Sequence, residues 1–213
     1  MTDKDTQPAN SLTREEILEE AMNVFYAKGV KDLNETELFE GLKISPNAFY
    51  SMFRNKEDLL EKAVRHNIKR DREIHEDLRS KSKNAVEELM SLLRHGVNVI
   101  KNISPVYIND LVNYYPGIMR IGVQNMQDYT LDLYSTIINR GIKEGLFRSD
   151  INIQIVTRVI MENVYVMINY RTFPPEKYSP GEVVRSIYLY YFRGLCRPEG
   201  AQIVDEYFSN HSF

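Results

Sequence analysis

The 213-residue chain has a single cysteine, Cys196, so it has neither a partner for an intramolecular disulfide nor the thiols for a zinc cluster. Long apolar runs are also absent: no uncharged stretch reaches the roughly 18 residues of a membrane-spanning helix, and the best candidate, residues 159–170, contains Glu162. The first residues are polar and acidic, without an apolar segment that would act as a signal peptide. We therefore expect a cytoplasmic protein with no membrane segment and a buried, structural thiol.

The chain also lacks the short patterns that carry most enzyme chemistry. It contains no glycine-rich phosphate loop and no Gly-x-Ser-x-Gly nucleophile motif. Its four histidines show neither a His-Glu-x-x-His motif nor another metal-ligand spacing. We predict no catalytic residue, no metal and no cofactor.

No segment alternates polar and apolar residues over the length of a strand, which argues against a sheet. Helical signals are frequent instead. Ile17, Ala21 and Val24 repeat at helical spacing, and Thr13 with Glu16 forms a capping-box pattern before them. The sequence thus predicts an all-α fold, with helices over 14–28, 35–42, 45–51, 55–79, 84–102, 105–115, 118–144, 151–170, 180–195 and 199–208.

Charge is unevenly distributed along a chain whose net charge is −3. Residues 1–60 contain 7 Lys and Arg against 12 Asp and Glu, whereas residues 61–213 carry a small positive excess. Within the acidic first part, residues 41–56 contain three basic side chains and no acidic one. One short surface of the N-terminal region is therefore free of negative charge, as contact with nucleic acid requires.

The same acid-free window has the pattern of a helix-turn-helix. Helix 35–42, a turn at Lys43-Ile44 and helix 45–51 have the lengths of this motif, whose second helix enters the DNA major groove. Helical spacing turns Ile44, Phe49 and Phe53 inward. It leaves an outward face of Pro46, Asn47, Tyr50 and Ser51. An incidental pair of short helices gives the same pattern, so the residues alone leave both interpretations open.

Residues 14–29 and 44–59, with the spacing Ser-x-x-x-x-Tyr-x-x-Phe-x-x-Lys, resemble the N-terminal DNA-binding region of the TetR family of bacterial one-component repressors. The resemblance covers about residues 13–62. It implies a homodimer in which a helix-turn-helix domain, residues 1–58, binds a palindromic operator in double-stranded DNA. Residues 59–213 would then form a helical domain that binds a small ligand and contains the dimer interface.

The resemblance also assigns roles to single residues. Ser45 would cap the recognition helix and reach a phosphate, Tyr50 would face the DNA backbone, and Lys56 would contact a phosphate. As an outward amide, Asn47 could read adenine. The complete predicted DNA-binding set is Lys43, Ser45, Pro46, Asn47, Tyr50, Ser51, Arg54 and Lys56. The departures from the family pattern include Leu33-Asn34-Glu35 at the entry to the second helix, Phe39 in place of a small alanine, and Lys43 in place of the turn glycine.

The C-terminal part is rich in tyrosine, with twelve of the fourteen tyrosines at or beyond Tyr107. Tyrosine and methionine together suit a pocket for a flat or amphipathic molecule, although such a stripe also occurs in ordinary cores. No paired acidic or basic cluster indicates a charged ligand, so we expect an uncharged or weakly polar effector. Its predicted contacts are Tyr107, Tyr114, Tyr115, Met126, Met161 and Tyr165.

Two late helices, 151–170 and 180–195, are apolar over much of their circumference, which requires burial on two sides. Either a dimer interface or the interior of a monomeric bundle would provide it. The predicted interface residues are Ile155, Val159, Val184, Ile187, Tyr188 and Tyr191. The function predicted is a ligand-responsive regulator, and the alternative is a helical small-molecule-binding protein that has lost DNA binding.

Overall fold

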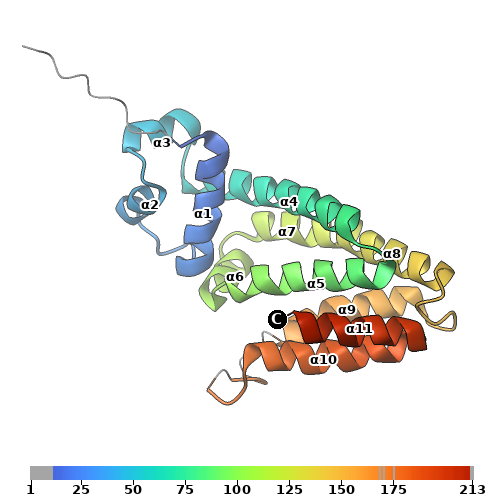
Figure 1. Ribbon diagram of the computed structural model, residues 1–213. Helices are drawn as coiled ribbons and strands as arrows, with labels where there is room; N and C mark the ends of the chain where they lie inside the picture. The colour runs from blue at the N-terminus through green and yellow to red at the C-terminus, as the bar shows by residue number, and fades with distance from the viewer. Residues whose placement is uncertain (1–11, 168, 170, 175, 212–213) are drawn as a thin grey trace, which may run out of the picture. The chain divides into compact units, whose positions relative to one another are not determined.

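The computed structural model describes residues 12–167, 169, 171–174 and 176–211, except for the side chain of Tyr165 (Figure 1). Every regular element in this part of the chain is a helix, which confirms the all-α class. None of these helices is long and apolar enough to cross a bilayer. The helices are α1 (Arg14–Lys28), α2 (Glu35–Leu42), α3 (Pro46–Met52), α4 (Lys56–Lys81), α5 (Ala85–Lys101), α6 (Pro105–Asn113), α7 (Pro116–Asn125), the π-helix η1 (Met126–Thr130), α8 (Leu131–Lys143), α9 (Ile153–Met167), α10 (Pro180–Leu195) and α11 (Pro198–Asn210).

Side-chain caps begin the first three helices where the sequence predicts them. The Thr13 hydroxyl accepts from the backbone N–H of Glu16, whose carboxylate accepts from the Thr13 N–H in return. An equivalent box formed by Asn34 and Glu37 begins α2, and Ser45 caps α3. These caps satisfy N–H groups that have no partner within the helix, so they fix where each helix starts.

The segment predicted as one helix over 118–144 is interrupted. It begins two residues earlier, at Pro116, and a π-helical turn over Met126–Thr130 separates α7 from α8. Such a turn widens the helix by one residue and rotates the faces on its two sides relative to each other. The hydrophobic pattern of the sequence gives no sign of it, because both flanking segments keep an ordinary helical period.

The chain divides into two compact units. The first contains the described residues up to Arg70 together with Ser104–Gly122, and the second contains Asp71–Ile103 and the residues from Val123 onward. The boundary predicted at residue 58 lies in the first turn of α4, whereas the compact units divide that helix at Arg70. The first unit therefore combines the predicted helix-turn-helix with α6 and part of α7.

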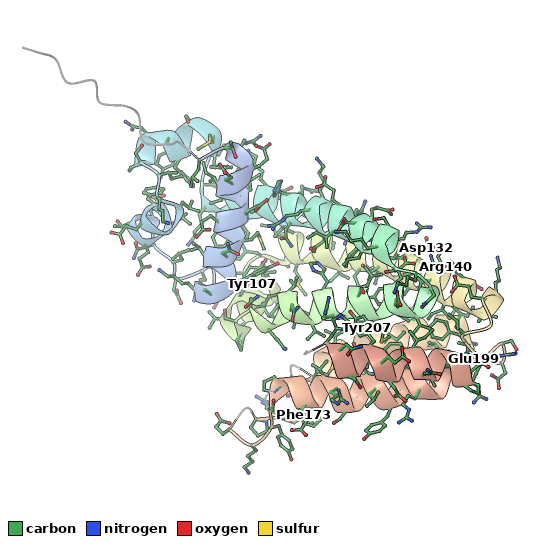
Figure 2. All side chains as sticks on the ribbon, in the orientation of Figure 1. Tyr107, Asp132, Arg140, Phe173, Glu199 and Tyr207 are labelled. Atoms are coloured by element: carbon green, nitrogen blue, oxygen red, sulfur yellow. The ribbon has the colours of Figure 1, made fainter. Side chains whose placement is uncertain are left out.

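Helix α6 is held in the first unit by contacts with distant residues. Figure 2 labels Tyr107 of this helix. Its ring packs edge-on against Tyr26 of α1, with ring centroids 5.1 Å apart. The buried carboxylate of Asp110 accepts hydrogen bonds from the backbone N–H groups of Val30 and Lys31, at 2.8 and 2.9 Å. These contacts fix the loop between α1 and α2, on which the start of α2 depends.

The core of the second unit is formed by α5, α8, α9, α10 and α11, and α10 lies beside α11 (Figure 1). Phe147, Tyr188 and Phe192 are almost completely buried there. The Tyr188 hydroxyl donates to the Ile160 carbonyl at 3.0 Å, which satisfies its polar end. Cys196 is also buried, and burial raises the pKa of its thiol to about 12, which agrees with the predicted structural role.

An ion-pair network joins α5 to α8 inside this unit. Glu88, whose exposed fraction is 1%, pairs with Arg140 at 2.6 Å. Arg140 also contacts Glu144 at 3.0 Å, while Arg79 lies 4.0 Å from the second carboxylate oxygen of Glu88. Since a buried charge is costly without a partner, the stability of this unit depends on Arg140.

Candidate nucleic-acid interface

Tight packing of α1, α2 and α3 positions the candidate interface. Phe49 and Phe53 are buried against this core, as the sequence predicts, and Ile44 is half-buried. A Cβ atom on Gly41 would lie 2.9 Å from Val24, so this glycine lets α2 approach α1 closely. The close approach therefore occurs at residue 41, and Phe39 is free to pack against Phe49, with ring centroids 5.0 Å apart.

The turn between α2 and α3 contains an unusual backbone conformation. Lys43 ends α2 with φ at 54°, in the left-handed region that favours glycine. Its side chain is exposed, beside the N-terminus of α3. The lysine thus places a positive charge next to the recognition helix where the family pattern has a turn glycine.

The face of α3 predicted to point outward is solvent-exposed. Pro46, Asn47, Tyr50 and Ser51 are all exposed. Within the described part of the chain the Asn47 amide forms no hydrogen bond, so both its donor and its acceptor are available. These exposed residues therefore form a polar face of α3, of the size that a major groove accepts.

Three hydroxyl groups on this surface have different partners. The Ser45 oxygen accepts from the Ala48 N–H, which leaves its own proton to donate to a phosphate. Ser51 donates to the Ala48 carbonyl at 2.7 Å. Tyr50 donates to the Glu35 carboxylate at 2.6 Å, and this bond raises the pKa of Tyr50. Tyr50 can therefore reach a phosphate only by releasing Glu35.

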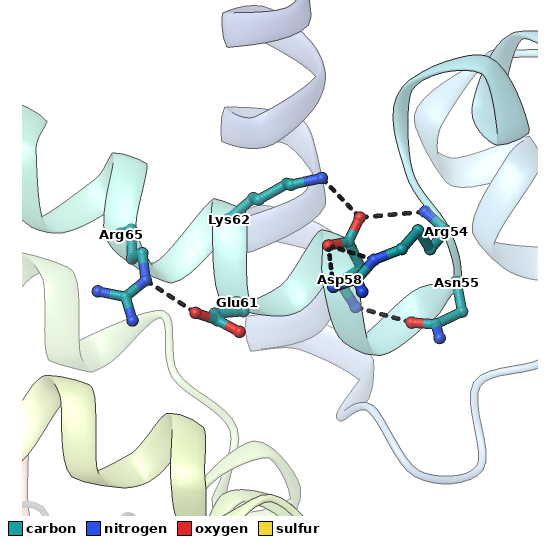
Figure 3. A network of polar contacts seen from close by, with 6 residues as sticks. All are labelled: Arg54, Asn55, Asp58, Glu61, Lys62 and Arg65. Atoms are coloured by element: carbon teal, nitrogen blue, oxygen red, sulfur yellow. Dashed lines mark hydrogen bonds and ion pairs between the residues drawn. The ribbon is translucent and has the colours of Figure 1, made fainter.

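Arg54 is oriented by Asp58 at the start of α4 (Figure 3). The Asp58 carboxylate accepts from the Arg54 backbone N–H, from its guanidinium and from Lys62, while the Asp58 N–H donates to Asn55. The Arg54 side chain is nevertheless 84% exposed, so the guanidinium keeps free N–H groups that point into solvent. Asp58 thus holds an exposed cation next to the C-terminus of α3.

Asp58→Asn should remove a pH-dependent part of the stability. Hydrogen bonds from Lys62 and Arg54 lower the pKa of Asp58 to about 2, from 3.8. Because the folded-state pKa is depressed, the carboxylate stabilises the fold fully above about pH 4, and this contribution is lost as the pH falls toward 2. Urea unfolding at pH 6 and pH 3 should show a smaller pH effect in the variant than in the wild-type protein. Equal pH effects in the two proteins would contradict this account.

The structure gives Lys56 a role other than the predicted phosphate contact. Its ammonium group donates to the carbonyls of Val30, Lys31 and Leu33, at 2.6, 3.1 and 2.6 Å. These three bonds use all three N–H groups, and burial lowers the pKa of the amine. Lys56 therefore fixes the carbonyl side of the same loop whose N–H groups are held by Asp110. The family spacing identifies the residue but not these partners, which lie more than twenty residues earlier.

Lys56→Met should therefore destabilise the first unit and leave the number of phosphate contacts unchanged. Loss of charge-assisted bonds to three carbonyls is expected to cost about 2–3 kcal/mol in the free energy of unfolding. The slope of log K against log salt for DNA binding should stay the same. Lys28→Met, at an exposed lysine of α1, serves as a control for stability. A shallower salt slope without a loss of stability would show that Lys56 contacts a DNA phosphate, as the family resemblance implies.

The residues predicted to bind a ligand are distributed over both units. Tyr107 is buried against α1 in the first unit, and burial raises its pKa above the usual range. Tyr114 is exposed and accepts a hydrogen bond from Lys31. Tyr115 is also in the first unit, whereas Met126 and Met161 are in the second. The side chain of Tyr165 lies outside the described residues.

A cavity of about 380 Å³ lies in the second unit, where α5 and α9 end and α10 begins. No predicted ligand residue with a described side chain lines it. The sequence pattern gives no sign of this site, because its residues come from three separate helix ends and each segment alone has the composition of ordinary core. Its lining residues are Val97, Ile100, Lys101, Val164, Met167, Pro180, Gly181 and Val184.

The predicted dimer residues differ in exposure. Val184 and Tyr188 are buried inside a single subunit, so for these two the alternative of burial within the bundle applies. Val159, Ile187 and Tyr191 are half-buried, while Ile155 is 60% exposed. Two further apolar side chains on these helices are exposed, Val166 on α9 and Tyr190 on α10, and the sequence pattern does not distinguish them.

Comparisons with known proteins agree with the family resemblance of the N-terminal region. The sequence model described as "Bacterial regulatory proteins, tetR family" matches residues 17–63, which contain the candidate interface. The HTH-type transcriptional repressor KstR2 of Mycobacterium tuberculosis is 23% identical over 175 residues, covering 79% of this chain and 82% of the relative.

Two solved structures share the fold. A TetR-family regulator from Cytophaga hutchinsonii has a TM-score of 0.67 at 18% identity, covering 88% of this chain and 98% of its own. The ketosteroid regulator KstR2 of M. tuberculosis has a TM-score of 0.60 at 22% identity, covering 88% of this chain and 97% of its own. These likenesses extend the similarity beyond the N-terminal region to the arrangement of the helices that follow.

Proposed function

Because the chain is a TetR-family transcriptional regulator, we propose that it represses transcription as a homodimer on a palindromic operator, from which a small molecule releases it. The observation that carries this proposal is the exposed polar face of α3, whose opposite side is anchored by the buried Phe49 against Phe39 of α2. The curated relative named above, KstR2, is a repressor, which supports the direction of regulation. The family consists of DNA-binding regulators and not of enzymes, which supports a role on DNA.

On DNA, α3 would enter the major groove. Asn47 would read a base edge, with adenine the base whose donor and acceptor match an amide. Lys43, Ser45 and Arg54 would contact phosphates on either side and set the register, because backbone contacts position the protein without reading sequence. Glu35 would leave Tyr50 on binding, so that the tyrosine can face the backbone.

The dimer would be built on α9 and α10. Ile155, Val166 and Tyr190 leave apolar surface exposed on these two helices. A two-fold contact there would present two recognition helices to two half-sites, about 34–36 Å apart or a multiple of that distance. The half-buried Val159 and Ile187, on the same two helices, would extend the contact.

Operator selection tests the proposal. Genomic fragments bound by the protein at low salt should share a palindrome, and footprinting should protect two half-sites. Failure to enrich any sequence would favour the alternative, a small-molecule-binding protein that no longer binds DNA. That alternative has one observation in its favour: Glu35, Glu37 and Glu40 place negative charge on α2, next to the recognition helix.

Asn47→Ala should change base preference on the selected operator. We expect a loss of about 1–3 kcal/mol of discrimination at one position of each half-site, since one bidentate contact disappears. The variant should bind operators altered at that position about as tightly as the wild-type protein does. Competition gel shifts would measure the affinity for the selected and the altered operators. Asn139→Ala, at an exposed position of α8, is the matched control. An equal loss of affinity for all bases at that position would indicate that Asn47 contacts the DNA backbone instead.

A further inference from the structure

The cavity in the second unit has apolar walls and one charged residue. Val97 and Ile100 of α5, Val164 and Met167 of α9, and Val184 of α10 supply the apolar surface. Lys101 is the one ionisable residue among the lining residues described above. The exposed Lys101 forms no ion pair within the part of the chain that the structure describes.

The start of α10 faces the same space. Pro180 and Gly181, the first two residues of α10, belong to the cavity wall. Ser179 precedes them as the N-cap, but its side chain makes no capping hydrogen bond. The Glu182 N–H donates instead to the Ser179 carbonyl at 3.0 Å, and Glu182 itself places an acidic side chain in this first turn. The start of α10 therefore adds no net positive charge to the wall, and Lys101 is the group that can attract an anion.

The volume limits the size of a ligand. A water molecule occupies about 30 Å³ in the liquid, so 380 Å³ holds about a dozen non-hydrogen atoms. The apolar walls require most of these atoms to be carbon, because a polar group there would lose its hydrogen bonds to water. Lys101 favours one negative charge at one end of the molecule.

We propose that this cavity binds a small amphipathic monocarboxylate, with an apolar body of about eight to twelve carbons and its carboxylate at Lys101. The inference rests on the proposed function in one respect, that this molecule is the effector. It revises the expectation of an uncharged effector, which depended on the absence of paired charged residues in the sequence. A single lysine beside an apolar cavity is enough to select an anion of this size.

Calorimetry on the full-length protein without DNA tests the ligand class. The probes are decanoate and decanol, which share their chain length and differ in the charged group. We expect decanoate to bind about tenfold more tightly, since a hydrogen-bonded ion pair contributes about 1.4 kcal/mol. Lys101→Gln should abolish this preference and leave decanol binding unchanged. Lys143→Gln is the matched control, because Lys143 is also an exposed lysine in the last turn of a helix, α8.

A second variant tests the location. Val164→Phe, at a half-buried wall position, should fill the cavity and weaken both probes at least tenfold, with an unchanged circular dichroism spectrum showing that the helices are intact. Equal affinity for the two probes, a preference that survives in Lys101→Gln, or no binding of either probe would each overturn the proposal. Operator binding is measured separately, so carboxylate binding without any effect on DNA would contradict the effector role alone.

Discussion

Arg140→Met is expected to lower the free energy of unfolding by about 3–5 kcal/mol, because it leaves a buried carboxylate without its partner. Glu88 is 1% exposed, and after the change its nearest cation would be Arg79, at 4.0 Å. For a chain of this length each kcal/mol corresponds to about 2–4 °C in the melting temperature, so thermal unfolding would show the change clearly.

Removing the charge of Glu88 instead separates the effect of an unpaired buried charge from a simple loss of packing. Glu88→Gln leaves Arg140 with Glu144 and with partial access to water, so the expected cost is smaller, about 1–3 kcal/mol. The double variant Glu88→Leu with Arg140→Met removes both charges and should recover most of the stability, since apolar replacement of a buried pair is often neutral. A double variant as unstable as Arg140→Met alone would show that packing, and not the unpaired charge, causes the loss.

Ile155→Glu combined with Tyr190→Glu is expected to give monomers and to lower operator affinity by about 10²–10⁴-fold, the advantage that two linked half-site contacts provide. The exposed fractions of these side chains are 60% and 67%, so the charges should leave the subunit fold intact. Sedimentation would report the association state, and gel shifts the affinity.

The controls for this prediction follow from the burial of the residues. A charge at Tyr188 would unfold the subunit, because the ring is buried and its hydroxyl is bonded to Ile160, so that position is unsuitable as an interface test. Thr136→Glu places the same charge on an exposed position of α8 and should leave both association and binding unchanged. A dimer that survives the double change would place the interface elsewhere.

Local sequence alone determined where the first three helices begin and which side of α3 faces outward. Thr13, Asn34 and Ser45 begin their helices through bonds to residues three positions later, and helical spacing turns Phe49 inward and Asn47 outward. Such features depend on neighbours within one turn, so a single sequence contains the information they need.

Only the tertiary structure decided the features that depend on distant segments. The three carbonyls around Lys56 belong to a loop more than twenty residues earlier, and Asp110 holds the N–H groups of that loop from eighty residues later. The cavity beside Lys101 requires the ends of α5 and α9 to meet the start of α10. The periodicity of a sequence shows which side of a helix is apolar, but the partner of that side, and the space left between them, depend on how the helices pack.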